Sequence, residues 1–371
     1  MILLLHNRYR VPGGEERAVE DLAWLIRTEL GDEVAVLERD SAALGRRRAA
    51  LGLLRGGLTP DDVAAAVRRT RARVVHAHNV QPSLGWRALA AARSAGARVV
   101  LHLHNYRLVC AVGTCFTRGE DCTRCHGRNT LPGVRLNCRG GSRPEAVAYG
   151  AGLALWQRRL AGSADAFVVP SASALRRLEQ LGARLEPRAH VIPSVQRSFA
   201  DRSRADRGEY ALYAGRLAAE KGVADAIAAC RLAHVPLVIV GEGPDEARLR
   251  AAAGDAVRFT GRVDPAELAA LRAAAGLALV PSRYEEILPL AALEAMAAGL
   301  PVMASRAGGL AELVPAQGLH PPGDVFAMAD RITALWRNAA AGEAALAVAR
   351  ERTAPAVVAA ALRAVYEAPG R

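Results

Sequence analysis

The sequence predicts an α/β protein of two domains, each a parallel sheet covered by helices on both faces. The chain has 371 residues, more than one hydrophobic core usually supports. Short apolar runs alternate with Ala-, Leu- and Arg-rich segments of helical length. Apolar runs without polar alternation are typical of strands buried on both faces. We expect two doubly wound, Rossmann-like domains facing each other across a cleft, with ligands at the carboxyl ends of the strands.

Eleven strands are predicted from these apolar runs. They cover residues 2–5, 34–37, 74–76, 99–103, 166–169, 190–192, 210–214, 237–240, 257–260, 277–280 and 302–304. The segment 196–208 is polar and lacks periodicity, and residues 199–208 are assigned as the linker. The predicted domains are residues 1–198 and 209–353. Residues 354–371 are expected to form a C-terminal helix that packs back on the N-terminal domain.

The net charge of +12 is concentrated in the first half of the chain. Residues 1–200 contain 30 arginines and 17 acidic residues, whereas residues 201–371 contain 19 basic and 20 acidic residues. An anionic membrane, an anionic substrate or a nucleic acid would each fit this excess, and so would a coding bias toward arginine on solvated helices. Nucleic acid is disfavoured because aromatic residues, at 4%, offer few rings for base stacking.

The apolar segments are too short to span a membrane or to form a signal peptide. We therefore expect a cytoplasmic protein. The arginines at 46–48, 55, 68–69 and 71 could hold it peripherally on the inner face of an anionic membrane.

One lysine stands among 48 arginines. It is Lys221, in the segment Gly-Arg-Leu-Ala-Ala-Glu-Lys-Gly at 215–222, directly after a predicted strand. A turn there would let Arg216 and Lys221 project into the cleft beside the amino end of a helix. Two cations and a helix terminus suit a diphosphate, although chance survival of a solvated lysine remains the alternative. Neither a P-loop nor a Gly-x-Gly-x-x-Gly motif is present.

Two glutamates mark a second motif, which covers residues 281–302 and runs strand, loop, helix, glycine, strand. Glu286 is predicted in the loop and Glu294 within the helix. Carboxylates in these positions can accept hydrogen bonds from sugar or ribose hydroxyls. An exposed pair on a solvated helix is the alternative.

Glycines and histidines follow strands in the first half. Gly13-Gly14 could bring backbone close to an anion, or could be an ordinary turn. The pairs His76/His78 and His102/His104 end two strands, and alternation places the members of each pair on one face. A metal site is less expected than local hydrogen bonding, and His104 is the candidate for substrate contact.

A long insertion at 109–142 holds five of the six cysteines: Cys110, Cys115, Cys122, Cys125 and Cys138. Cys122 and Cys125 have the spacing of half a zinc knuckle, and Cys110 and Cys138 flank them. A structural zinc on these four residues and reactive thiols remain open alternatives. Cys230 is predicted to be a core residue.

These motifs resemble those of the family 4 retaining glycosyltransferases of the GT-B fold. The matching segments are 215–222, 241–244, 286–302 and 307–312, and residues 210–330 are covered closely. The amino half matches more loosely, through Gly13-Gly14 and His104-Asn105. In place of a Phe-Gly pair that the family often has after the first glutamate, this chain has Leu288-Pro289, and proline has no N–H to donate.

The resemblance implies that residues 1–198 form the acceptor side and that residues 209–353 bind the nucleotide sugar. It implies that Arg216 and Lys221 hold a donor diphosphate, that Glu294 holds the ribose, and that Glu286 and His104 meet the donor sugar. It implies catalytic roles for His104, Arg216, Lys221 and Glu286. The implied donor-binding residues are Gly13, Gly14, Arg216, Lys221, Gly241, Val263, Glu286, Leu288, Leu290 and Glu294.

The expected function is a retaining glycosyl transfer from a nucleotide-diphosphate sugar to a glycan or lipid-linked acceptor, in cell-surface polysaccharide or glycoconjugate synthesis. No Asp-x-Asp motif occurs, so no metal cofactor is expected in catalysis. A nucleotide-sugar epimerase of the same fold is the alternative function, and a nucleic-acid-binding protein is a distant one.

Overall fold

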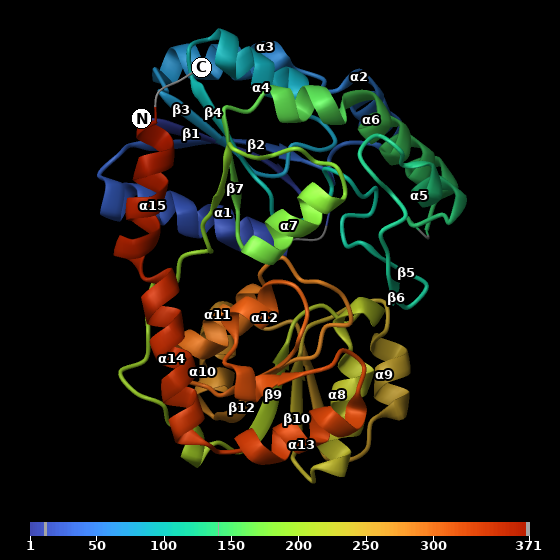
Figure 1. Ribbon diagram of the computed structural model, residues 1–371, viewed down its shortest axis with the longest axis vertical. Helices are drawn as coiled ribbons and strands as arrows, with labels where there is room; N and C mark the ends of the chain where they lie inside the picture. Colours follow the sequence, from blue (N-terminus) through green and yellow to red (C-terminus); the bar gives the residue numbers. More distant parts are fainter. Residues whose placement is uncertain (11–12, 140, 369–371) are drawn as a thin grey trace. The chain divides into compact units, whose positions relative to one another are not determined.

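The computed structural model describes residues 1–10, 13–139 and 141–368, and its chain divides into two compact units. The N-terminal unit comprises Met1–Cys115, Cys122–Val195 and Pro355–Arg371. The C-terminal unit comprises Phe116–Asp121 and Gln196–Ala354. Each unit is an α/β fold built on its own six-stranded sheet (Figure 1). The predicted fold class is thereby confirmed.

The N-terminal sheet is parallel, with strand order β2-β1-β3-β4-β7-β8. Its strands are β1 (Ile2–Arg8), β2 (Val34–Asp40), β3 (Val74–Ala77), β4 (Arg98–His102), β7 (Ala166–Val169) and β8 (Ala189–Val191). Its helices are α1 (Gly14–Leu25, continued by a π-helical turn at Ile26–Leu30), α2 (Arg46–Arg55), α3 (Pro60–Thr70), α4 (Gly85–Ser94), α5 (Leu131–Arg135), α6 (Arg143–Gly162), α7 (Ala172–Gln180) and α15 (Pro355–Glu367).

Helices cover both faces of this sheet (Figure 1). On one face, Ile2 and Leu4 of β1 form a core with residues of α1 and α15. Strand alternation turns Leu3 and Leu5 to the other face, where α3 and α4 lie. Because both sets are buried, β1 reads as a solid apolar run in the sequence.

The C-terminal sheet is also parallel, with strand order β11-β10-β9-β12-β13-β14. Its strands are β9 (Tyr210–Ala214), β10 (Leu237–Val240), β11 (Val257–Gly261), β12 (Ala275–Val280), β13 (Val302–Ser305) and β14 (Leu319–His320). Its helices are α8 (Val223–Leu232), α9 (Glu246–Ala252), α10 (Pro265–Ala273), α11 (Leu290–Ala297), α12 (Gly309–Leu313), α13 (Val325–Leu335) and α14 (Ala339–Thr353). The strand order reverses between β9 and β12, and ligands bind doubly wound sheets at such a reversal.

All eleven predicted strands are present, with ends that differ by no more than three residues. The strands that the prediction missed are β5 (Phe116–Thr117), β6 (Glu120–Asp121) and β14. Each has two residues, too few to show a hydrophobic period. Within the described ranges, every helix falls short of the length and apolar character needed to cross a bilayer.

Candidate active site

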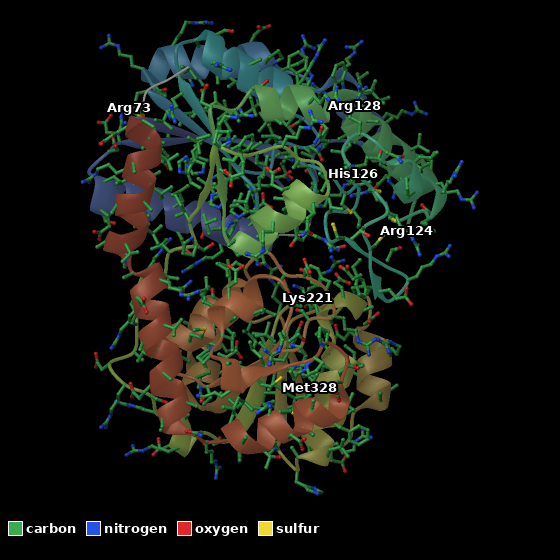
Figure 2. The ribbon with its side chains drawn as sticks, in the orientation of Figure 1. Arg73, Arg124, His126, Arg128, Lys221 and Met328 are labelled. Carbon is green, nitrogen blue, oxygen red and sulfur yellow. The ribbon has the colours of Figure 1, made fainter. Side chains whose placement is uncertain are left out.

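A partly buried ion pair lies at the carboxyl ends of β9 and β12. Lys221 ends a 3-10 turn after β9 (Figure 2), and its Nζ lies 2.5 Å from Oε1 of Glu286, in the loop after β12. Glu286 also accepts hydrogen bonds from the hydroxyls of Ser282, at 2.6 Å, and Tyr284, at 2.7 Å. Ser282 and Tyr284 were not predicted as site residues, although both lie inside the motif that contains Glu286.

Both members of the pair are held in their charged forms. Burial opposes ionisation of Glu286, which is 7% exposed, but Lys221 and the two hydroxyls outweigh burial and lower the pKa of Glu286. Burial likewise opposes the charge on Lys221, yet Glu286 raises the pKa of that ammonium above its ordinary value. Burial and the nearby carboxylate raise the pKa of Tyr284 well above its usual range. Tyr284 is therefore a neutral hydrogen-bond donor.

The loops after β9 and β12 are tied to each other. The Arg283 N–H donates to the Glu220 carbonyl at 2.8 Å, and the Arg283 guanidinium makes two 2.6 Å hydrogen bonds to Asp225. Gly222 has φ +66°, and a Cβ there would lie 2.0 Å from the Pro281 carbonyl oxygen. These contacts fix the backbone on both sides of the Lys221–Glu286 pair.

The helix terminus that suits an anion is that of α11. The first turn of α8, beside Lys221, already contains the Asp225 carboxylate, whereas the first turn of α11 contains no acidic residue. Pro289 is the N-cap of α11 and contributes no N–H, so the first N–H groups of the helix are those of Leu290 and Ala291, and Leu288 lies just before the cap. The Glu286 carbonyl accepts the Gly309 N–H at 2.7 Å and so holds the preceding loop.

Glu294 lies within α11, as predicted, but the structure does not pair it with Lys221. Its carboxylate forms an ion pair with Arg272 of α10 and remains half-buried.

Arg216 is exposed and forms no ion pair within the described part of the chain. Gly241 follows β10 with φ +127°, and Val263 follows β11. The predicted residues of this unit thus follow or adjoin the carboxyl ends of its strands.

In the N-terminal unit, the predicted glycine pair already has an internal acceptor. The Gly13 N–H donates to Glu16 at 2.7 Å, and the Tyr9 N–H donates to the same carboxylate at 2.9 Å. Burial would raise the pKa of Glu16, but hydrogen bonds from His6 and from these backbone groups lower it to about 2. Gly14 begins α1. The carboxylate of Glu16 therefore occupies the position expected for an anion at Gly13.

His104 lies at the carboxyl end of β4, half-buried among other histidines. Its Nε2 is 2.8 Å from Nδ1 of His78, and its ring stacks on His102 at a centroid distance of 4.0 Å. Within the described residues, the one group of three potential metal ligands that converge within 4.8 Å is His76, His78 and His102.

The thiols of the cysteine-rich segment influence one another without converging as closely. A hydrogen bond with Cys115 lowers the pKa of Cys110 to about 6. Burial and the neighbouring thiolates raise the pKa of Cys125 to about 11, and Cys110, Cys122 and Cys138 all contribute to this effect. No disulfide forms among the described cysteines. Cys230, in α8, is 1% exposed and is a core residue as predicted.

Two family models match the chain. A model described as "Glycosyl transferase 4-like domain" matches residues 10–194, and one described as "Glycosyl transferases group 1" matches residues 208–338. Glycogen synthase of Mycobacterium tuberculosis is 41% identical over 155 residues, which cover 38% of this chain and 37% of the relative. A GDP-mannose-dependent alpha-mannosyltransferase of Mycolicibacterium smegmatis is 35% identical over 185 residues, which cover 46% of this chain and 48% of the relative. The chain spans less than half the length of each relative.

Solved structures share the whole fold. Sucrose-phosphate synthase from Thermosynechococcus elongatus superimposes with a TM-score of 0.71 at 19% identity, over 99% of this chain and 98% of that one. Anabaena HepE, solved in complex with UDP and glucose, gives a TM-score of 0.64 at 20% identity, over 98% of both chains. The two family models together span most of the sequence, and the chain therefore belongs to the family 4 glycosyltransferases of the GT-B fold.

Proposed function

We propose that this chain is a retaining glycosyltransferase. It would move a sugar from a nucleotide-diphosphate donor to a glycan or lipid-linked acceptor, in polysaccharide or glycoconjugate synthesis. The observation that carries the proposal is the Lys221–Glu286 pair at the strand-order reversal between β9 and β12. The names of the relatives, which include a GDP-mannose-dependent alpha-mannosyltransferase and a glycogen synthase, support a nucleotide-sugar donor.

The pair can serve both parts of such a donor. Lys221 carries three N–H donors, so its ammonium can keep its contact with Glu286 and still bind a phosphate oxygen. The exposed Arg216 and the amino end of α11 would add positive charge where the diphosphate leaves. Glu286, oriented by Ser282 and Tyr284, has lone pairs for the sugar hydroxyls.

In the transfer, the bond between the anomeric carbon and the phosphate oxygen breaks, and its electron pair leaves with the nucleoside diphosphate. The acceptor oxygen bonds to the anomeric carbon, and its proton would pass to the departing diphosphate oxygen. The chain's own cations would neutralise the leaving group, so we propose that no divalent metal is required. The remaining donor contacts are predictions from the family resemblance. They are Glu294 for the ribose, His104 for the donor sugar, and Gly13, Gly14, Gly241, Val263, Leu288 and Leu290 as further donor-binding residues.

A panel of nucleotide sugars, headed by GDP-mannose and UDP-glucose, tests this function. Binding raises the unfolding temperature by mass action, so one donor should stabilise the wild-type chain and should stabilise the Glu286→Gln variant less. Arg331→Gln, an exposed change on α13, is the matched control. The stabilising donor should then be consumed only with an acceptor. Its conversion to an epimer without acceptor would instead identify an epimerase.

We also propose that α2 and α6 hold the chain against an anionic membrane. The arginines of α2 at 46–48 and 55 are exposed, and three of them stand at the positive end of the helix, where cations destabilise it. Leu51 and Leu54 on α2 are 40% and 44% exposed, and Val147 and Leu155 on α6 are 51% and 49% exposed. The Trp156 indole of α6 donates to the Leu54 carbonyl at 2.9 Å, which joins the two helices. Cations beside exposed apolar side chains suit a lipid surface.

Liposome flotation checks the membrane proposal. Vesicles with anionic headgroups should bind the chain in low salt, and Arg47→Glu with Leu54→Glu should reduce binding at least tenfold, since each surface charge contributes about 1 kcal/mol. Arg331→Glu, in the C-terminal unit, should bind like the wild type. Equal binding to neutral and anionic vesicles would refute the proposal.

The predicted zinc on Cys110, Cys122, Cys125 and Cys138 is retained as a proposal, supported by the mutual influence of these thiols on the Cys125 pKa. Cys122→Ser with Cys125→Ser should lower the zinc content of the purified chain by one equivalent, measured by elemental analysis. Unchanged zinc content would exclude these ligands.

A further inference from the structure

Histidines gather on one face of the N-terminal sheet, under α1 and α15. They are His6, His76, His78, His102 and His104. The register pairs Ala77 with Leu5 on one side and with Leu101 on the other, so the next residue, His78, lies between His6 and His102. His76 and His78 are 0% and 2% exposed, and His102 is 9% exposed. The cluster lies at the strand-order reversal of this sheet, between β1 and β3.

Several ring nitrogens in the cluster have no hydrogen-bond partner among the described residues. They include Nε2 of His76, Nε2 of His78 and both ring nitrogens of His102. A buried polar atom without a partner costs on the order of 1–3 kcal/mol, so an accumulation of them in one core calls for a ligand.

The existing hydrogen bonds are compatible with the tautomers that a metal needs. His76 Nδ1 lies 2.6 Å from the Tyr366 hydroxyl of α15, and His78 Nδ1 lies 2.8 Å from His104 Nε2. With each Nδ1 carrying the proton and donating it, the Nε2 lone pairs of His76 and His78 are left unused. An outer hydrogen bond of this kind is the usual support for a metal-bound imidazole.

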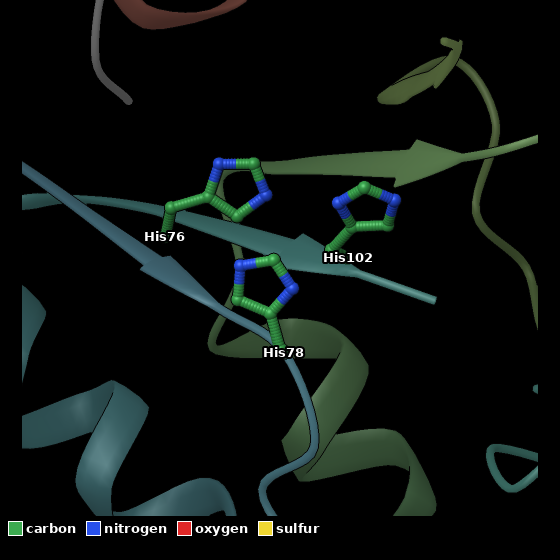
Figure 3. A group of neighbouring side chains, drawn as sticks. All are labelled: His76, His78 and His102. Carbon is green, nitrogen blue, oxygen red and sulfur yellow. The ribbon is translucent and has the colours of Figure 1, made fainter. Parts of the chain in front are cut away.

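The geometry is close to that of a bound ion. Figure 3 shows the three rings around a common space, with His76 and His78 from one strand and His102 from its neighbour. One nitrogen from each ring lies within 4.8 Å of the others. Zinc–nitrogen bonds of about 2.0–2.1 Å place tetrahedral ligands about 3.4 Å apart, so each ring would need to move inward by less than about 1 Å.

Two carboxylates lie near the His104 end of the cluster. Glu15 and Glu16 of α1 are near enough to act electrostatically on His104. Their negative charge would partly offset that of a dication on the neighbouring rings, without any carboxylate among the ligands.

We propose that His76, His78 and His102 bind one late first-row divalent ion, with Zn²⁺ as the natural occupant. His76 and His78 would bind through Nε2, and His102 through the ring nitrogen nearest to them. Three imidazoles without thiolate or carboxylate suit Zn²⁺, Co²⁺, Ni²⁺ or Cu²⁺ and disfavour Mg²⁺ or Ca²⁺. A fourth position is left for water.

The ion would also act on His104 through the chain. A cation on His78 polarises the Nδ1–H that is donated to His104 Nε2, which fixes the His104 proton on Nδ1. This part rests on the proposed function, in which His104 meets the donor sugar. Metal binding itself does not depend on that function, since Lys221 is not one of the three ligands. A Lys221 variant without transferase activity should therefore bind the ion normally.

The experiment uses the full chain without a polyhistidine tag, in a Cys122→Ser, Cys125→Ser background that removes thiolate ligands. After chelator treatment, calorimetry with ZnCl₂ should show one bound equivalent, and CoCl₂ should give visible ligand-field bands without a thiolate charge-transfer band. His102→Gln and His76→Gln should each weaken Zn²⁺ binding at least 100-fold. Tyr366→Phe, which removes only the outer hydrogen bond, should weaken it about 10–100-fold. His190→Gln, on β8 of the same sheet, is the matched control and should bind like its parent.

The absence of Zn²⁺ binding to the folded parent, or equal affinity in His102→Gln, would overturn the proposal. X-ray absorption of the cobalt-loaded parent gives a second measurement that needs no histidine variant. It should show three imidazole ligands, and a shell with fewer than three would equally overturn the assignment.

Discussion

At the scale of single residues, the size of the Lys221 side chain matters as much as its charge. Its ammonium fits among Glu286, Tyr284 and the backbone of the β9 loop, where the side chain is 23% exposed. A planar guanidinium is wider and would displace these neighbours. We expect Lys221→Arg to fold normally and to lose most transfer activity, with a fall in kcat/KM of roughly 100-fold.

Steady-state kinetics with the identified donor measures this loss. Arg331→Lys, a swap in the opposite direction on an exposed face, should leave kcat/KM unchanged. Near-normal activity in Lys221→Arg would mean that the lone lysine survived by chance.

A second residue-scale effect concerns acid stability. The pKa of Glu16 is about 2 in the folded chain and is ordinarily 4.5. A lowered folded-state pKa stabilises the fold above pH 4.5, and this contribution disappears as the pH falls toward 2. We expect Glu16→Gln to lose on the order of 2 kcal/mol of unfolding free energy at pH 7 and much less at pH 2.5. Urea unfolding at both pH values, with the exposed Glu29→Gln as control, measures the difference.

At the scale of elements, the loop after β9 depends on a glycine that packs against the loop after β12. Gly222→Ala combines a left-handed backbone, φ +66°, with a Cβ only 2.0 Å from the Pro281 carbonyl oxygen. We expect it to cost about 3 kcal/mol and to weaken donor binding. Gly323→Ala, at φ +77° with open space around it, should cost only about 1 kcal/mol. Urea unfolding measures the free energy of unfolding of each variant. Equal decreases in Gly222→Ala and Gly323→Ala would show that backbone strain alone explains both.

The sequence predicted elements better than it predicted the contacts between them. Buried parallel strands carry continuous apolar runs, so β1 and β9 could be recognised locally. The Lys221–Glu286 pair joins residues 65 positions apart and depends on β9 lying beside β12, which no local pattern encodes. The acceptor of the Gly13 N–H was missed for a different reason. Glu16 lies only three residues away and caps the helix locally, but the glycine pair was interpreted as a site for an external anion.

At the scale of the whole molecule, the N-terminal unit is completed by a helix from the end of the chain. Leu362 of α15 is 2% exposed and belongs to the same core as Ile2 and Leu4. We expect Leu362→Ala to cost 2–5 kcal/mol in the unfolding of the N-terminal unit, as buried leucines do, with no change in the C-terminal unit. Val357→Ala, on the exposed side of α15, should change stability by less than about 0.5 kcal/mol. Calorimetry that resolves the unfolding of the two units measures this effect. Equal shifts of both unfolding temperatures in Leu362→Ala would contradict the expectation.

The return of α15 to the N-terminal unit also sets an order of events on the ribosome. Synthesis proceeds from the amino end, so α1 can cover its part of the face made by Ile2 and Leu4, but the part that α15 covers stays exposed while residues 196–354 are being translated. The C-terminal unit has all its strands before α15 emerges, and it can reach its native state first. The nascent N-terminal sheet, with an apolar face exposed for that interval, is the part of the chain most in need of a chaperone.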